Sequence, residues 1–387
     1  LEAIFRYGPT ALYAQVAARA VSRLGVGCRC GHLDATSFHV DGDYNHAEVP
    51  AEDGRVIRIT PGYSRDHRPD LNQVVLQLIA ERQAGIPLLM EALDGNNSDK
   101  RSFRETVNAY MEQLNQEYGL EYLIADSALY TAETLGEMNG FYWITRVPET
   151  LDLARVLIQA TAPDLMTNRE QARFISIGTR YADVAQRWVI VYSPEAYQRA
   201  IKTVNKASLH QTSAELTAFE QVCRQTFACE KDAHKALSEL EKKLRHTQIF
   251  DARIIAQARY SGRGRPAKQR VPDYQTYRIE GQLASRLEPH RQRLQRKSCF
   301  ILATNQQDLE ALSDADLIKM YKDQQKVERG FRFLKDPLFM ASTLFLKSPE
   351  RIMALMMVMT LCLMVYAALE YRIRQSLIQA QQTFPNQ

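Results

Sequence analysis

The stretch GHLDATSFHVDG, Gly31 to Gly42, alternates apolar and polar residues in the manner of a β-strand. This alternation places Leu33, Ala35 and Ser37 on one side of the strand. Asp34 lies inside the same stretch, so we expect a carboxylate within a strand that carries apolar residues. We take this strand as the first element of the fold and read the chain outward from it.

The elements that follow this strand alternate between strands and helices. We predict two short extended runs within 46–62, around the turn dipeptide Asp53-Gly54, and a strand over 86–93. The segment 71–85 fits either a strand or a helix. Helical spacing, capping residues and further strand patterns predict a helix that begins at Ser98, a strand at 121–129, a short helix from Thr131 to Gly140 and a strand at 141–147.

The order of elements is three strands, a helix, a strand, a helix and a strand. This order is the layout of the ribonuclease-H-like fold. In that fold the first and fourth strands lie side by side at the centre of the sheet. Asp34 on the first strand and Asp126 at the carboxyl end of the fourth would then face each other across a short gap. Two carboxylates that close repel each other unless a cation lies between them. The predicted fold class is α/β, a ribonuclease-H-like mixed five-stranded sheet flanked by helices.

A length of 387 residues exceeds the ~250–300 residues of a single core, so we expect two domains or one domain with a large insertion. The strand SCFILATN, Ser298 to Asn305, returns the chain to the core after a region of different pattern. We predict a helical lead-in at 1–30, a core at 31–147, an inserted domain with long helices and basic strands at 148–297, and a second part of the core at 298–387.

Charge is segregated along the chain. The net charge is only +4, but Arg253 to Lys297 contains twelve Lys and Arg residues against three acids. Such a segment indicates a polyanionic partner. A solvated basic linker is the alternative for its central loop.

Cysteine usage and hydropathy bear on the compartment. The six cysteines contain no Cys-x-x-Cys pair, so they support neither a zinc site nor a disulfide framework, and a reducing cytosol fits best. Residues 352–369 form a stretch of eighteen residues without a charge, which is at the lower limit of the length that spans a membrane. Charged residues at both ends favour a buried core helix over a membrane span, which stays open as the alternative.

The stretch YKDQQKVERGFRFLK, Tyr321 to Lys335, continues a helix that we expect to begin at Ser313. At helical spacing Tyr321, Gln324, Glu328 and Lys335 share one stripe. Asp34, Asp126 and Glu328 then offer hard oxygen ligands from three elements, which suits a pair of Mg²⁺ ions that act in phosphodiester displacement. The simpler interpretation is that each Asp belongs to a turn or cap and that the mixed-charge helix is a solvated face.

The same stretch resembles the Tyr-Arg-Glu-Lys signature of DDE-type transposases of bacterial insertion sequences, with Tyr321, Glu328 and Lys335 in register. The stretches HLDATSFHVDG and LIADSALYT are similar to the first and second acidic motifs of that family. The stretch GYSRDHRPDLNQ resembles a signature of one of its branches. The similarity extends from about Gly31 to Leu369, and it departs from the signature at Gln324, which replaces an Arg.

The resemblance implies a DNA transposase that excises and integrates an insertion sequence by metal-dependent hydrolysis and strand transfer. Asp34, Asp126 and Glu328 would be catalytic and would hold two Mg²⁺ ions, with Mn²⁺ as a substitute. The DNA-binding residues that it implies are Tyr321, Gln324, Lys335, Arg332, Arg329, Lys322, Arg65, Arg68, Arg263, Arg265, Lys268 and Arg270.

The resemblance also bears on partners and location. The implied partners are transposon ends, target DNA and a second copy in a synaptic homodimer, without a membrane, in the bacterial cytoplasm and at the nucleoid. The helical lead-in at 1–30 would be the end of a truncated N-terminal DNA-binding region.

Two alternatives remain. One is a ribonuclease-H-like nuclease that cuts without joining, and the other is an inactive, transposase-derived DNA-binding protein, for which Gln324 leaves room. If the stripe is one helical face, Arg332 lies beside Glu328 and Lys326 lies almost opposite. We therefore expect Arg332→Ala to impair cleavage more than Lys326→Ala, and Gln324→Arg to be tolerated or mildly stimulating through an added phosphate contact.

Overall fold

The computed structural model describes residues 1–42, 44, 56–63, 68–138, 140–261, 271–336, 343–344 and 346–383. The predicted turn at Asp53-Gly54 lies outside these residues. The chain divides into two compact units. Unit 1 comprises Leu1–Pro148, Ser176–Val189 and Ile301–Gln387, and unit 2 comprises Glu149–Ile175 and Ile190–Phe300. The range 148–297, which we predicted as an insertion, therefore contributes residues to both units.

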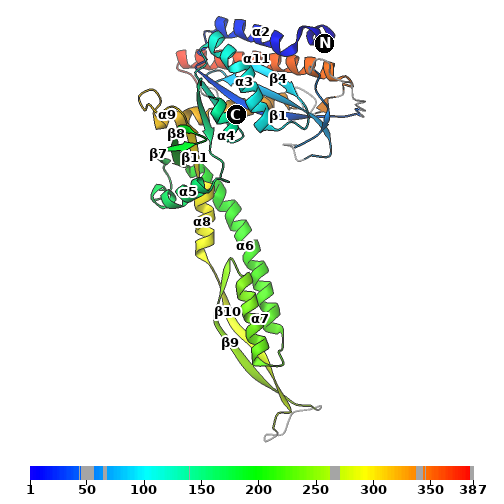
Figure 1. Ribbon diagram of the computed structural model, residues 1–387, viewed down its shortest axis with the longest axis vertical. Helices are drawn as coiled ribbons and strands as arrows, with labels where there is room; N and C mark the ends of the chain where they lie inside the picture. Colours follow the sequence, from blue (N-terminus) through cyan, green and yellow to red (C-terminus); the bar gives the residue numbers. More distant parts are fainter. Residues whose placement is uncertain are drawn as a thin grey trace. The chain divides into compact units, whose positions relative to one another are not determined.

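Five strands of unit 1 form the sheet that the order of elements predicts (Figure 1). Strand β1 (Cys30–Val40) pairs antiparallel with β3 (Asn72–Glu81), which pairs antiparallel with β4 (Pro87–Leu93). On its other side β1 pairs parallel with β5 (Tyr122–Ala125), and β5 pairs parallel with β6 (Tyr142–Arg146). The order β4-β3-β1-β5-β6 is ribonuclease-H-like, so the predicted fold class is confirmed. The segment that fitted either a strand or a helix is a strand.

Two helices connect the parallel strands of this sheet. Helix α3 (Asp99–Tyr118) joins β4 to β5, and α4 (Ala132–Glu137) joins β5 to β6. Thr131 caps α4 as predicted, since its Oγ1 accepts a hydrogen bond from the Thr134 amide at 3.2 Å. The predicted end of that helix at Gly140 is wrong, because α4 ends at Glu137. Ser98 holds the N-cap position of α3 without a capping hydrogen bond from its side chain.

The sheet is wider than the five strands predicted, because ten strands belong to it in the described residues. The additional strands are β2 (Thr60–Pro61), β12 (Thr343–Leu344), β11 (Cys299–Thr304), β8 (Val184–Tyr192) and β7 (Arg173–Tyr181). Strand β11 pairs antiparallel with β6 and carries the sheet onward to β8 and β7. The turn between β7 and β8 places Ala182 and Asp183 at positive φ, 52° and 58°, which suits a tight hairpin.

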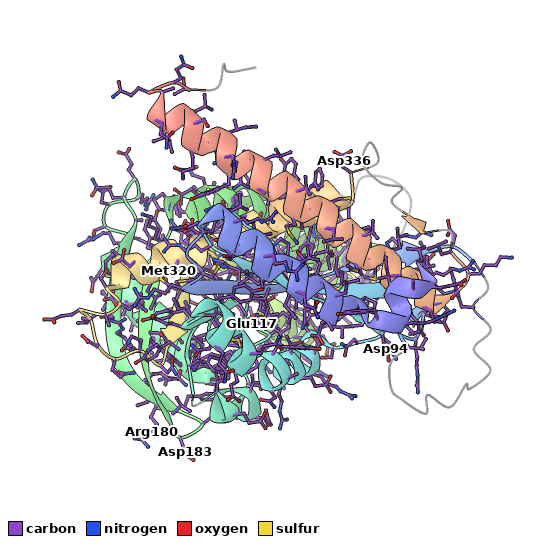
Figure 2. The ribbon with its side chains drawn as sticks, turned by 90° about the horizontal axis from the view of Figure 1, so that it is seen from above. Asp94, Glu117, Arg180, Asp183, Met320 and Asp336 are labelled. Carbon is purple, nitrogen blue, oxygen red and sulfur yellow. The ribbon has the colours of Figure 1, made fainter. Side chains whose placement is uncertain are left out.

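Three helices near the chain ends pack together in unit 1. They are α1 (Glu2–Tyr7), α2 (Pro9–Leu24) and α11 (Pro349–Gln379). Helices α2 and α11 lie side by side and both contact β4 (Figure 1 and Figure 2). Helix α2 ends at Gly25, whose φ of 63° is the left-handed conformation common after a helix.

Helix α11 contains the long uncharged segment. Within the described residues it is the one helix long and apolar enough to span a membrane, and half of its apolar window is buried inside the protein. Core helices of globular proteins meet the same criteria. Its first half, around Ile352 and Met356, is buried, but Val365 and Leu369 are 58% and 57% exposed. Leu363, Met364 and Ala367 are buried, so the second part of 352–369 is buried on one face and exposed on the other.

Unit 2 consists of helices and a two-stranded ribbon. Its elements are α5 (Asp152–Leu165), α6 (Pro194–Arg224), α7 (Glu230–Lys243), β9 (Thr247–Arg259), β10 (Tyr274–Ser285) and α8 (Leu287–Ser298). Strands β9 and β10 pair antiparallel, and one face of the ribbon packs on α6 and α7 through a cluster around Phe219, Leu240 and Leu244. The strands predicted in this region are present as this ribbon, but only β9 is basic, because Arg278 of β10 is balanced by Glu280.

Candidate functional site

A row of ionisable residues crosses three neighbouring strands of the sheet. Leu33 of β1 is paired with Ala125 of β5, and Ala125 is paired with Thr145 of β6. The residues that follow these three positions are Asp34, Asp126 and Arg146. Opposed residues on adjacent strands, about 4.8 Å apart, project from the same face of a sheet. The strand register therefore brings two carboxylates and a guanidinium together.

Both aspartates have one carboxylate oxygen fixed by a backbone amide. Asp34 is only 7% exposed, and its Oδ1 accepts a hydrogen bond from the Ala35 amide at 2.8 Å. Asp126 is the first residue after β5, and its Oδ1 accepts from the Ala128 amide at 2.8 Å. Its carbonyl oxygen accepts from Thr145 Oγ1 at 2.6 Å, which ties the end of β5 to β6. Amide hydrogen bonds of this kind favour the charged form of a carboxylate.

Tyr321 connects the third acid to this row. It lies on helix α9 (Asp314–Lys322), and Glu328 lies on the next helix, α10 (Gln325–Leu334). Burial raises the pKa of Tyr321 to about 12, and four charges act on the phenol: Arg146, which lowers the pKa, and Asp126, Glu328 and Asp34, which raise it. The phenol is therefore within electrostatic reach of the three predicted acids and of Arg146. Sequence reasoning missed Arg146, although the alignment of β5 with β6 would have placed it opposite Asp126.

The three predicted acids suit a hard divalent cation by their chemistry and partly by their positions. Asp34 and Asp126 supply oxygen ligands from adjacent strands, as a Mg²⁺ ion prefers. Glu328 is exposed on α10 and shares their electrostatic neighbourhood. Among the described residues no three His, Cys, Asp or Glu side chains lie close enough to form a closed metal cluster. The two aspartates therefore fit as ligands of one metal site, and the role of Glu328 as a third ligand stays a prediction.

The predicted single helix through Tyr321 and Lys335 is wrong, because a turn at Asp323 and Gln324 separates α9 from α10. The Gln324 amide donates to the Tyr321 carbonyl at 3.2 Å, and the Lys326 amide donates to the Asp323 carbonyl at 3.0 Å. Both bonds span three residues, which tightens the backbone relative to an α-helix. Gln324 is buried in this turn at 8% exposure, so it does not present its amide on an open helical face.

The other predicted DNA-binding residues lie in different settings. Lys335 follows the end of α10, and its Nζ lies 5.7 Å from the ring centroid of Phe38, four residues after Asp34 on β1. Lys322, Arg329 and Arg332 are exposed on α9 and α10. Arg68 pairs with Asp70 at 2.8 Å on the surface. Arg65, Arg263, Arg265, Lys268 and Arg270 lie outside the described residues.

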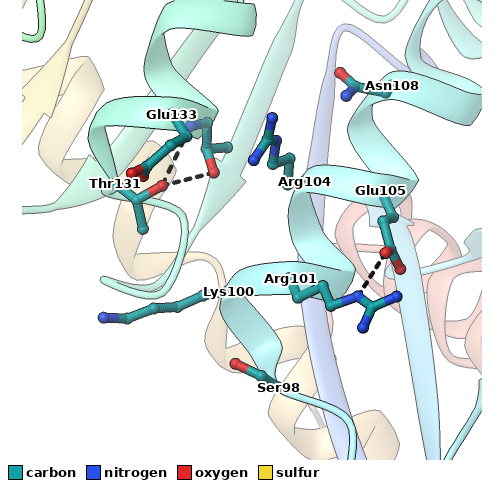
Figure 3. A pocket seen from close by; sticks show the side chains of 9 residues that line it. Ser98, Lys100, Arg101, Arg104, Glu105, Asn108, Thr131 and Glu133 are labelled. Atoms are coloured by element: carbon teal, nitrogen blue, oxygen red, sulfur yellow. Dashed lines mark hydrogen bonds and ion pairs between the residues drawn. The ribbon is translucent and has the colours of Figure 1, made fainter.

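Two cavities share lining residues at the start of α3, and the sequence did not predict them. The first, of about 370 Å³, is lined by residues that follow Asp34 on β1, by Ala128 and by the start of α3, including Ser98 and Lys100. The second, of about 480 Å³, shares Ser98 and Lys100 and continues to α4. Figure 3 shows Lys100, Arg101 and Arg104 on α3 and Thr131 and Glu133 at the start of α4 around this second cavity.

The cations of these cavities differ in how they are neutralised. Arg101 pairs with Glu105 at 2.7 Å, and Arg104 pairs with Glu137. Lys100 is exposed in the first turn of α3 and lines both cavities. Lys100 therefore lines a cavity that also contains Thr36 and Ala128, two residues after Asp34 and Asp126 in the sequence.

Comparison with known proteins places the chain in a family. The sequence profile of the transposase DDE domain matches residues 29–365. No curated protein matches the chain. Among solved structures, the chain is similar to a piggyBac transposase synaptic complex with hairpin DNA at 6% identity and a TM-score of 0.39, over 93% of this chain and 50% of that one. It is also similar to a Mos1 transposase paired-end complex with left transposon end, at 13% identity and a TM-score of 0.20, over 34% and 39%. The chain thus spans about half the length of the piggyBac chain.

Proposed function

Because this chain belongs to the family of transposase DDE domains, we propose that it excises an insertion sequence from DNA and joins it to a new site. The steps are metal-dependent phosphodiester hydrolysis and strand transfer. The observation that carries the proposal is the row of Asp34, Asp126 and Arg146, with Tyr321 within electrostatic reach of all three. Family membership supports a DNA transposase, an enzyme with nuclease and transferase activity, and the detailed steps belong to the proposal.

DDE transposases generally use divalent metal ions. In the proposal Asp34, Asp126 and Glu328 hold two Mg²⁺ ions, with Mn²⁺ as a substitute. Bound ions of this kind lower the pKa of a water molecule and stabilise the leaving oxygen of the phosphodiester. The backbone amides of Ala35 and Ala128 orient one oxygen of each aspartate.

Tyr321 and Arg146 act on the phosphate rather than on the metal. The raised pKa of Tyr321, about 12, keeps its hydroxyl protonated at neutral pH, so it can donate to a phosphate oxygen. Arg146 brings a positive charge to the same neighbourhood, where negative charge accumulates on the phosphorane oxygens. In the hydrolysis, water forms a bond to phosphorus and the bond from phosphorus to the 3′ oxygen breaks, which leaves a 3′-hydroxyl and a 5′-phosphate. In the joining step, the 3′-hydroxyl of the element forms a bond to a phosphorus of target DNA, and the 3′ oxygen of the target strand leaves as a hydroxyl.

The proposed partners are the two element ends and target DNA. Lys100 beside the two cavities and Lys335 near Phe38 are cations suited to the phosphate backbone next to the aspartates. The basic segment 253–297, most of whose described residues lie on β9, β10 and α8, extends this electrostatic attraction. The proposal also includes a homodimer that holds both ends, and action in the bacterial cytoplasm at the nucleoid.

The test is a cleavage and joining assay with the element's own ends. With Mg²⁺ the wild-type chain should nick the ends and join them to target DNA, and with Ca²⁺ it should bind without cutting. Asp34→Asn, Asp126→Asn and Glu328→Gln should each abolish cleavage and leave end binding largely intact, because each removes a ligand charge without removing a DNA contact. Cleavage without joining would identify a nuclease instead, and binding without cleavage would identify an inactive DNA-binding protein.

A further inference from the structure

The turn between β3 and β4 contacts the junction between α9 and α10. Arg82, the first residue after β3, donates from Nε to Asp323 Oδ2 at 2.6 Å. Both side chains are 28% exposed. Asp323 belongs to the turn that separates the two helices, so this ion pair holds the turn from outside. The two residues are 241 positions apart in the sequence.

A second contact lies three residues further along the chain. Lys326 Nζ donates to the carbonyl oxygen of Arg82 at 2.6 Å and to that of Gln83 at 3.1 Å. Gly85 in the same turn has a φ of 76°, and a Cβ at this position would lie 3.7 Å from Lys326 Cβ. The β3–β4 turn therefore contacts the first turn of α10 through the hydrogen bonds of Lys326, and a side chain at position 85 would touch Lys326.

The β3–β4 turn is itself held in one conformation. The buried carboxylate of Glu81 accepts hydrogen bonds from the amides of Gln83, Ala84 and Ile86 at 2.5, 2.6 and 3.0 Å. The Glu81 amide donates to the Ile86 carbonyl at 2.9 Å. A turn with this many internal bonds presents its carbonyl groups to Lys326 in a fixed geometry.

The contact also connects the helix of Glu328 to the strand of Asp34. Strand β3 pairs with β1 residue by residue, including Asp34 with Leu78 and His32 with Ala80. The buried imidazole of His32 is within electrostatic reach of Asp323, Arg82 and Lys326. The ion pair and the lysine therefore lie close to β1, two residues before Asp34.

We propose that Arg82, Asp323 and Lys326 form a clamp that positions Glu328 for catalysis. The turn after α9 interrupts the regular helical hydrogen bonds, so α9 alone does not fix the direction of α10. Glu328 lies two residues after Lys326 and five after Asp323, within the first turn of α10. The clamp sets the orientation of this turn relative to the sheet that carries Asp34 and Asp126. The inference rests on the proposed function, because it assigns Glu328 a role at the metal.

The first test asks whether the clamp fixes α10. Arg82→Asp should raise the rate of amide hydrogen exchange in 325–334, and so should Asp323→Arg. The double swap of Arg82→Asp with Asp323→Arg should restore protection, because it rebuilds the pair with reversed charges. Arg29→Asp is the matched control, since it breaks the exposed 2.7 Å pair with Glu121 in the same unit. Unchanged exchange in 325–334 for both single variants, or a swap that restores nothing, would overturn the clamp.

The second test asks whether the clamp acts through Glu328. Mn²⁺ binding by titration calorimetry should weaken in Arg82→Asp, by less than in Glu328→Gln, and the double variant should be no weaker than Glu328→Gln alone. Single-turnover cleavage should fall roughly ten- to a hundredfold in Arg82→Asp, the cost of a carboxylate misplaced by about 1 Å. Lys326→Met should behave alike, and Lys326→Arg should recover part of the activity. Additive losses of Mn²⁺ affinity would show that the clamp does not act on Glu328.

The two proposals fail separately. A wild-type chain that neither binds Mn²⁺ nor cleaves DNA would contradict the proposed function and the role given to Glu328. Hydrogen exchange would still decide whether the clamp holds α10. A chain that cleaves, and whose cleavage and Mn²⁺ affinity do not respond to Arg82→Asp, would contradict the clamp alone.

Discussion

Asp126 and Arg146 occupy matching positions at the ends of two neighbouring parallel strands, each one residue beyond the paired Ala125 and Thr145. A positive charge next to a carboxylate lowers the attraction of that carboxylate for a metal cation, and it raises the attraction of the site for a phosphate. Arg146 therefore weakens metal binding and strengthens phosphate binding, so its removal should change the two in opposite directions.

Arg146→Met should slow single-turnover cleavage by about tenfold or more, because a charge that stabilises the phosphorane is lost. Its affinity for Mn²⁺ should stay the same or rise, because the repulsion between guanidinium and cation is gone. Cleavage rates and calorimetric Mn²⁺ titrations of the same preparations check both signs. A variant with clearly weaker Mn²⁺ binding would mean that Arg146 supports the acids rather than the phosphate.

Gln324→Arg should destabilise the protein, contrary to the expectation from the sequence. Gln324 is buried at 8% exposure in the turn between α9 and α10, so an arginine would bring a charge into a buried position. The free energy of unfolding should fall by roughly 2–4 kcal/mol. Chemical denaturation measures this, with the exposed Gln325→Arg as the matched control. An unfolding midpoint equal to that of the control, together with faster cleavage, would support the sequence prediction that position 324 lies on the phosphate-binding face.

Lys326→Ala should cost more stability than Arg332→Ala, whereas helical spacing predicts the larger loss of cleavage for Arg332→Ala. The Nζ of Lys326 bonds two backbone carbonyls, whereas Arg332 is exposed on α10. Loss of charge-assisted hydrogen bonds costs about 1.5–3 kcal/mol, and exposed substitutions cost within about 0.5 kcal/mol. Cleavage should follow the same order if the clamp positions Glu328. A larger loss of cleavage for Arg332→Ala would support the sequence interpretation.

Glu91 should make stability depend on pH. Burial raises its pKa above the ordinary value of 4.5, and hydrogen bonds from Thr106 and Tyr110 oppose the rise. Because the folded pKa exceeds the unfolded one, the stabilisation from this group is complete below pH 4.5 and is lost as the pH rises through the folded pKa. Glu91→Gln removes the loss and keeps an acceptor for Thr106. Its stability relative to wild type should therefore be greater at pH 8 than at pH 4.5.

Denaturation curves at the two pH values check this prediction. Glu91→Ala is the control, because it removes the acceptor and should be destabilising at both values. A difference in stability between Glu91→Gln and wild type that does not change with pH would show that Glu91 has the same pKa in the folded and the unfolded protein.

The sequence contains enough to predict the centre of the sheet, because strands have a period of two and their ends carry turn residues. Asp34 and Asp126 could be found this way, and the order of elements put their strands side by side. Arg146 was within reach of the same reasoning, had the ends of 121–126 and 141–146 been aligned as parallel neighbours. Local sequence pattern is enough here, because apolar and polar alternation identifies each strand and the turn residues after it identify its last residue.

The break between α9 and α10 could not be predicted in this way. The periodicity of Tyr321 to Lys335 continues through Asp323 and Gln324, and neither residue prevents a helix. What fixes the turn is a partner 241 residues earlier, Arg82, whose contact with Asp323 depends on the finished fold. The burial of Gln324 and the hydrogen bonds of Lys326 to the carbonyls of Arg82 and Gln83 likewise depend on the finished fold, so helical spacing alone does not show them.

The most direct test of the central claim, that Asp126 binds the catalytic metal, is metal rescue of a cysteine variant. Asp126→Cys should be inactive in Mg²⁺, which binds oxygen ligands, and should regain measurable cleavage in Mn²⁺, which accepts sulfur more readily. Wild-type chain should cleave in both metals, and Asp126→Ala should cleave in neither. Cleavage by Asp126→Cys in Mg²⁺ at the wild-type rate would contradict the account, because the carboxylate would then not be needed at the metal.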